Sequence, residues 1–319
     1  MVYILNKEVN KHNNFWKRVL VSLTTGYILY FYSESLFWAW PNPDESILWI
    51  LVGWLLYSIF AFVFLLNIDM FKANSIWAVF LVGAVYGWLN EGLVAITTYD
   101  LTYGLPLNIS WTGLAWHAII SVLIGWYYVR KILAENNYKK TIILASLIGF
   151  FYGFWAIYWP IEKAAIAIDK FSQQAVFFTL LLIAAHIVYD KVKLTEFKAS
   201  KKEKAILWAI SVLYFVFVTI QTNFLAVLIL PALLLLTYFA LRHNRKIEKK
   251  ESALISFNRR IKLVNYLLLL FIPIVAVGIY GMAYILNFFP ATNFIVYYIT
   301  MPLGFILYFV SLFKVFSKP

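Results

Sequence analysis

Long apolar runs dominate this chain and constrain what it can fold into. A helix needs about 20 mostly apolar residues to cross the hydrocarbon core of a membrane, and the 319-residue sequence contains about ten such runs. They lie near residues 19–40, 46–67, 74–97, 110–131, 141–162, 173–190, 205–221, 224–242, 263–287 and 294–313. The sequence therefore predicts an all-α, polytopic transmembrane helix bundle of about ten spans.

The basic residues predict how these spans are oriented. Of the 27 Lys and Arg residues, all but Lys163 and Lys170 lie in alternate segments, which would share one side of the membrane. Cytoplasmic loops retain Lys and Arg, so we expect this side to be the cytoplasm. Both termini should lie there as well, because an even number of spans returns the chain to its starting side. We predict a multi-pass protein of the plasma membrane.

Composition excludes several classes of protein. The chain is 63% hydrophobic and 20% aromatic, whereas soluble domains are about 45–50% apolar. The net charge of +12 would suggest a nucleic-acid partner in a soluble protein. Here the cations border the spans, so we expect contact with anionic headgroups of the bilayer and no nucleic acid. The sequence contains no cysteine, which excludes disulfides and thiolate metal sites.

A basic segment at 191–204 separates two unlike halves. Residues 1–195 would form six spans that carry the ionisable side chains, and residues 196–319 would form a four-span, proline-containing scaffold. In the first half, the hairpins 74–131 and 141–190 form a weak repeat, each with two glycines spaced by four. The repeat indicates either a duplication or small residues that let helices approach closely.

Three ionisable residues are expected at one depth near the outer face. Glu91 lies about six residues from the outer end of span 74–97, roughly 9 Å at 1.5 Å per residue. His117 has a comparable depth on the returning span 110–131, and Glu34 on the first span. Because adjacent antiparallel spans are usually neighbours, we predict that Glu91 and His117 touch. Shallow carboxylates that reach headgroup water are the alternative.

Aromatic residues gather near the same level. Trp88, Trp116 and Trp155 are the candidates that could line an outward-facing pocket between spans one, three, four and five. Rings in such a pocket could stack a sugar, a prenyl chain or an organic cation. An interfacial aromatic belt would explain the same residues without a ligand.

Three further ionisable residues are secondary candidates. Glu162 ends the span 141–162 on the same helical face as Trp155 and would be a pocket rim residue or a solvated interfacial charge. His186 and Asp190 are spaced by four residues and so share a helix face. They could orient an imidazole for metal binding or proton transfer, or Asp190 could simply begin the basic loop.

These patterns predict binding or transport of a small or amphipathic ligand, with Glu91 as a proton- or cation-coupling group and His117 as its partner. A membrane-embedded enzyme is the first alternative, in which the pair would act as acid and base on a lipid-linked or peptide substrate, with or without a metal. A non-catalytic subunit or scaffold is the second. The sequence does not identify a cofactor, a metal or an oligomeric state.

Overall fold

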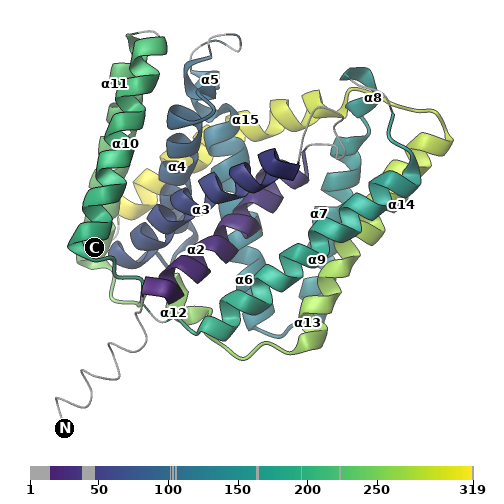
Figure 1. Cartoon of the computed structure of the whole chain (residues 1–319), viewed down its shortest axis with the longest axis horizontal. Helices are drawn as coiled ribbons and strands as arrows, with labels where there is room; N and C mark the ends of the chain where they lie inside the picture. Colours follow the sequence, from purple (N-terminus) through teal and green to yellow (C-terminus); the bar gives the residue numbers. More distant parts are fainter. Residues whose placement is uncertain are drawn as a thin grey trace.

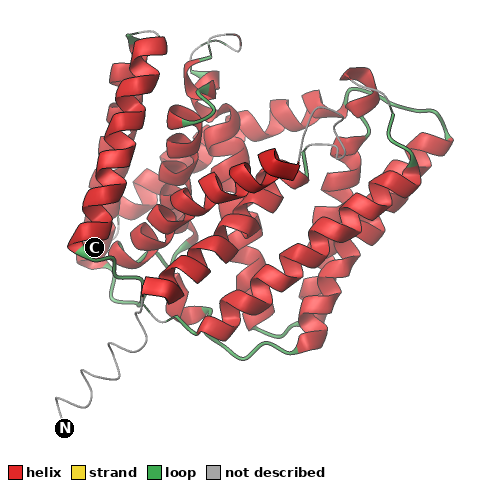
Figure 2. Cartoon of the chain, in the orientation of Figure 1, coloured by secondary structure: helices red, strands yellow, loops and turns green. Residues whose placement is uncertain are grey.

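The computed structural model describes residues 15–37, 47–100, 102, 104, 106–162, 165–194, 196–222 and 224–317, without the side chains of 220, 225 and 226. Helices joined by short loops make up this part of the chain, and it contains no strand (Figure 2). The helices are α2 Phe15–Tyr30, η1 Phe31–Ser35, α3 Ile47–Met70, α4 Ile76–Leu93, η2 Thr97–Tyr99, α5 Leu107–Ser110, η4 Trp111–Tyr128, α6 Val129–Ala134, α7 Tyr138–Ala156, α8 Trp159–Glu162, α9 Ile168–Val192, α10 Lys201–Gln221, α11 Leu225–Ile247, α12 Ala253–Ser256, α13 Leu263–Leu267, η5 Leu268–Leu270, α14 Phe271–Ile285 and α15 Thr292–Phe316. The predicted all-α fold is confirmed.

Eight helices in the described residues are long and apolar enough to cross a membrane. They fall in eight of the ten predicted runs, and α2 continued by η1, together with α10, occupies the other two. The bundle places α5 and α8 at one end, and α12 and α13 at the opposite end (Figure 1). This arrangement matches the predicted alternation of non-basic and basic segments. The ten-span count and the side of each terminus stay predictions.

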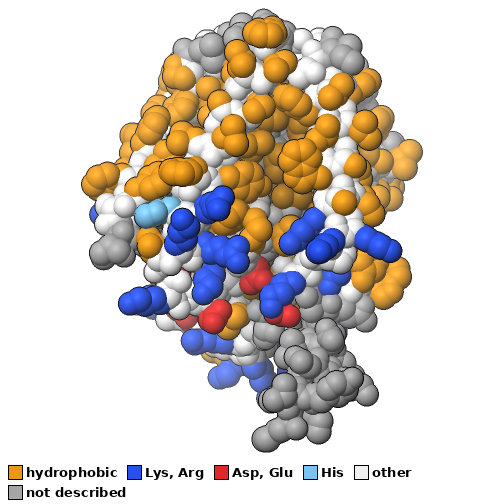
Figure 3. Space-filling view, turned by 90° about the vertical axis from the view of Figure 1, so that its left-hand side faces the viewer, with side chains coloured by type: hydrophobic (Ala, Val, Ile, Leu, Met, Phe, Trp, Pro, Cys, Tyr) orange, Lys and Arg blue, Asp and Glu red, His pale blue; other side chains and the backbone are white. Residues whose placement is uncertain are grey.

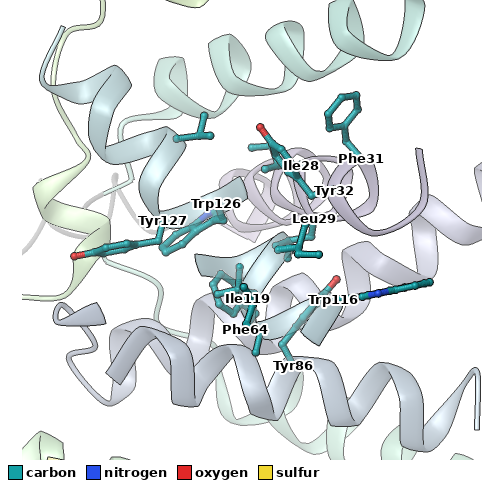
Figure 4. Close-up of a cluster of buried hydrophobic side chains, with 14 of the residues drawn as sticks. Ile28, Leu29, Phe31, Tyr32, Phe64, Tyr86, Trp116, Ile119, Trp126 and Tyr127 are labelled. Atoms are coloured by element: carbon teal, nitrogen blue, oxygen red, sulfur yellow. The ribbon is translucent and has the colours of Figure 1, made fainter. Parts of the chain in front are cut away.

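The α4 helix forms the centre of the bundle. Its side chains are almost all buried, whereas most residues in the apolar stretch of α3 are only partly buried or exposed. The α4 helix packs most extensively against η4, with α3, α11 and α15 around it. Part of this core is drawn in Figure 4, where Phe64 lies edge-on against Tyr86 and Trp126. A central, buried α4 means that any polar side chain on it needs a partner from a neighbouring helix.

Glycines spaced by four determine the closest helix contacts. A methyl group on Gly83 of α4 would lie 3.0 Å from Val122, and one on Gly87 would overlap the carbonyl oxygen of Gly113. In α7, methyl groups on Gly149 and Gly153 would meet backbone carbonyls of α14. Both glycine pairs therefore act in packing, as small residues do between membrane helices.

The two predicted hairpins have different neighbours. The α4 and η4 helices pack on each other, whereas α7 packs mainly on α14, and α9 on α2 and α14. The duplication and the division into two halves stay predictions. Three prolines of residues 196–319 lie in helices. Pro231 and Pro302 lie inside α11 and α15. Pro273 lies near the start of α14, just after the 3₁₀ segment η5, where the helical hydrogen-bond pattern changes.

Candidate functional site: a buried carboxylate–imidazole pair beside a polar cavity

Glu91 and His117 form the predicted contact. The Nε2 atom of His117 lies 2.6 Å from Oε1 of Glu91, and both residues are buried. Glu91 sits in the last turn of α4, where the negative end of the helix dipole disfavours a carboxylate. A partner that donates to this carboxylate is therefore required, and η4 supplies it.

Two glycines allow this contact. Because Gly87 has no side chain, the backbone of Gly113 can approach α4 directly, and the Cβ of His117 lies 3.0 Å from where a Gly87 methyl would be. On the opposite side, a methyl on Gly113 would lie 2.9 Å from the Trp88 ring. The short distance between α4 and η4 thus follows from the glycine positions in the sequence.

Two threonine hydroxyls complete the surroundings of Glu91. Thr97 donates a hydrogen bond to Oε2 of Glu91, and its hydroxyl lies 2.8 Å from that of Thr112. Thr97 can reach back because Ile96 adopts a left-handed backbone conformation (φ 55°) that reverses the chain just after α4. Such a conformation is strained for a β-branched residue. The Glu91 carboxylate at the end of α4 is therefore surrounded by groups from two other segments, η2 and η4.

The winding of η4 places Thr112 and His117 on one side. In an α-helix, residues five apart point in different directions. The η4 segment is a π-helix, in which the backbone hydrogen bonds join residues five apart. Glu34 lies in a second π-helical segment, η1. π-helical turns are frequent at functional sites. The two π-helical segments η1 and η4, which carry Glu34 and His117, therefore mark this region as a candidate site.

Glu34 and Glu91 line one cavity. Its volume is about 220 Å³, and Glu34 accepts a hydrogen bond from the hydroxyl of Tyr57, which also lines the cavity. The ring of Tyr57 also lies 5.8 Å from that of His117, which links the two carboxylate positions. The lining residues are Tyr30, Glu34, Trp49, Ile50, Gly53, Leu56, Tyr57, Asn90, Glu91, Val94 and Ala95. The cavity is thus acidic and aromatic, with no Lys or Arg among these residues.

The second imidazole nitrogen has a distinct role. The Nδ1 atom of His117 is buried and has no hydrogen-bond partner among the described residues. A neutral imidazole carries a proton on one ring nitrogen only, so an Nε2–H group would donate to Glu91 and leave Nδ1 as a hydrogen-bond acceptor. The pair thus places an imidazole against a carboxylate that lines the cavity described above.

The predicted tryptophans lie elsewhere. Trp88 donates to the Ile109 carbonyl, and Trp155 donates to that of Phe37 at 2.8 Å. Trp116 stacks on Phe37 with ring centroids 4.2 Å apart. All three tryptophan side chains are buried against other rings, and none lines the acidic cavity. The cavity is lined by spans one, two and three (α2 with η1, α3 and α4), whereas the sequence predicted a pocket between spans one, three, four and five. Spans four and five contribute no lining residue, and their tryptophans Trp116 and Trp155 pack on each other.

The remaining candidates do not join this site. Glu162 is exposed at the end of α8. His186 and Asp190 share a face of α9, as predicted, but both bind the buried Arg130: its guanidinium donates to Asp190 and lies 3.2 Å from Nδ1 of His186. Tyr266 also donates to Asp190. This second cluster connects α6, α9 and α13 at the end of the bundle opposite the cavity.

Sequence reasoning missed Tyr57, Thr97, Thr112 and Arg130. Arg130 lies at the end of the predicted span 110–131, beside a basic segment, and it is fully buried. Its partners could have been inferred, because His186 and Asp190 lie near the end of the span 173–190 that faces the same basic side as the end of the span carrying Arg130. Nothing in the spacing of the three hydroxyl residues indicates their partners.

No group of three or more His, Cys, Asp or Glu residues in the described part of the chain could hold a metal ion. No protein-family model matches this chain, and no curated protein or solved structure has significant similarity to it. Function must therefore be argued from the geometry of the site.

Proposed function

We propose that this protein is a ten-span membrane protein that binds a small or amphipathic cationic ligand in the Glu34–Glu91 cavity and moves it in exchange for protons. Both termini would be cytoplasmic and the cavity would face outward. The observation that carries the proposal is that two carboxylates from different helices line one cavity, and one of them is bonded to a histidine.

Charge supports a cationic ligand. Carboxylates within a membrane are costly unless a proton or a cation compensates them. Tyr57 donates to Glu34, and Nε2 of His117 lies 2.6 Å from Glu91, while the residues that line the cavity include no Lys or Arg. The aromatic rings of Tyr30, Trp49 and Tyr57 add favourable surfaces for an organic cation. A cation and protons would therefore compete for the same two groups.

The Glu91–His117 pair supports coupling to protons. Two groups this close titrate as a unit, so a cation beside Glu91 would change the number of protons that the pair holds. Binding and protonation would then be linked reciprocally. In the enzyme hypothesis the same pair would act on a substrate, and in the scaffold hypothesis it would only join two helices.

Proton exchange in proteoliposomes tests the proposal. The protein is reconstituted with a pH-sensitive dye inside, and tetramethylammonium is added outside. This ion carries a fixed charge and cannot itself carry a proton. We expect internal alkalinisation with the wild type and none with Glu91→Gln. The matched control is Glu162→Gln, which removes an exposed carboxylate outside the cavity and should leave the signal unchanged.

A wild-type protein that exchanges no protons and binds no tetramethylammonium in calorimetry would contradict the proposal. Binding without exchange would overturn transport and retain the binding site. An equal loss of signal in Glu91→Gln and Glu162→Gln would contradict the assignment of the cavity, because only one of these carboxylates lines it.

A further inference from the structure

A large apolar groove runs along the opposite face of α4. Its volume is about 690 Å³, within the range of about 300–1,000 Å³ that is usual for ligand pockets. Side chains of α3, α4, α10 and α11 line it, and most of them are hydrophobic. They are Val63, Leu66, Asn67, Met70, Leu89, Leu93, Lys204, Leu207, Trp208, Ser211, Val212, Phe215, Leu230, Pro231, Leu234, Leu235 and Tyr238.

The groove exists because α10 packs loosely. The helix contacts chiefly α4 and α11, and it exposes Trp208 and Leu213. The α10–α11 hairpin stands at one side of the bundle in Figure 1. Seen from that side, hydrophobic side chains cover the upper part of the surface and Lys and Arg gather below them (Figure 3). The groove therefore combines an apolar wall with a cationic end.

Lys204 supplies a positive charge to the groove itself. Its acidic neighbour Glu203 is occupied by Arg18, whose Nη2 donates to both carboxylate oxygens at 2.7 and 2.9 Å. Lys204 has no ion-pair partner among the described residues. This end of the groove is complementary to an anion.

The middle of the groove is compatible with a hydrocarbon chain. Besides Ser211, its polar side chains are Asn67 and Tyr238, which are bonded to each other: Nδ2 of Asn67 donates to the Tyr238 hydroxyl at 3.1 Å. An apolar ligand beside them leaves neither group unpaired. From Lys204 to Phe215, α10 rises about 16 Å at 1.5 Å per residue, close to half of a hydrocarbon core of about 30 Å.

We propose that this groove binds an anionic phospholipid, with its phosphate beside Lys204 and an acyl chain along α3, α4 and α11. The lipid would come from the membrane leaflet on the side of the basic segments. It would fill the space between the α10–α11 hairpin and the rest of the bundle. This site is separate from the acidic cavity, whose charge excludes an anion.

Native mass spectrometry of the full chain tests this. The protein is purified in mild detergent with equal amounts of phosphatidylglycerol and phosphatidylcholine, and bound lipid is measured. We expect the wild type to retain phosphatidylglycerol preferentially. Lys204→Ala should lose this preference, whereas Lys202→Ala, which changes an exposed lysine outside the groove lining, should keep it. Ser211→Trp should fill the groove and lose both lipids, whereas Val216→Trp, on the same helix but outside the lining, should retain them.

Three results would overturn the proposal: equal retention of the two lipids by the wild type, unchanged preference in Lys204→Ala, or unchanged retention in Ser211→Trp. Soluble glycerol phosphate in large excess separates a lipid site from a site for a free anion. If it displaces phosphatidylglycerol completely, the acyl chain contributes nothing and the groove is not a lipid site. We expect little displacement.

Discussion

Gly87→Ala is expected to separate α4 from η4 and weaken the Glu91–His117 bond. The added methyl group would overlap the carbonyl oxygen of Gly113. Backbone atoms cannot rotate away as a side chain can, so the helices must shift. Overpacking of this kind costs about 1–3 kcal/mol, which exceeds the gain of about 0.5–1 kcal/mol from replacing glycine by alanine inside a helix.

The matched control is Gly278→Ala in α14. A methyl group at this position meets no atom within 4 Å, so only the helix gain of about 0.5–1 kcal/mol remains. Unfolding in mild detergent, followed by circular dichroism, measures both variants against the wild type. We expect Gly87→Ala to be less stable and Gly278→Ala to be slightly more stable.

The imidazole resonances report on the site directly. The sequence has four histidines, so nitrogen-15 labelling of histidine gives few signals. Gly87→Ala should shift the His117 resonances and leave those of His186 unchanged, because His186 lies in the other cluster. A Gly87→Ala protein as stable as Gly278→Ala, with unchanged His117 signals, would refute the close approach of α4 and η4.

Two further predictions concern ion pairs away from the cavity. Burial raises the pKa of the Glu203 carboxyl, but bonds from Ser200 and Arg18 outweigh it and hold the pKa below its ordinary value. The stabilisation by this ion pair is therefore complete above the unfolded-state pKa and is lost as the pH falls through the folded-state pKa. In Arg18→Gln, the free energy of unfolding should fall less steeply as the pH is lowered than it does in the wild type. An unchanged fall would contradict the pairing of Arg18 with Glu203. Asp190→Asn leaves the Arg130 guanidinium buried without its anion and should lower unfolding stability by about 3–5 kcal/mol, whereas Asp169→Asn, an exposed control, should have almost no effect in the same denaturation assay.

The sequence predicts the elements and one contact of the site. Hydrophobic runs and basic segments were sufficient for the all-α bundle, because each span must satisfy its own backbone hydrogen bonds in lipid. The Glu91–His117 contact followed from matching depth on adjacent antiparallel helices. Both inferences use local properties of the chain.

The parts that could not be predicted depend on non-local packing. The rotation of each helix decides that Tyr57 faces Glu34 and that Trp116 faces Phe37 instead of a cavity. The π-helical winding that brings Thr112 beside His117 has no simple signature in the sequence. Hydrophobic periodicity is also weak where helices are buried on all sides, so it does not identify the face of α4 that carries the site.

The central claim is that Glu91 titrates and binds a ligand, beyond joining two helices. Glu91→Gln keeps the size and hydrogen-bonding capacity of the side chain, whereas Glu91→Leu leaves the imidazole unpaired at a cost of about 1–3 kcal/mol. The decisive measurement is calorimetry of tetramethylammonium binding in buffers of different ionisation enthalpy, combined with unfolding of the same samples. We predict proton release on binding by the wild type, no binding by a normally stable Glu91→Gln protein, and a less stable Glu91→Leu protein. Cation binding by Glu91→Gln equal to that of the wild type, without proton release in either, would contradict the account.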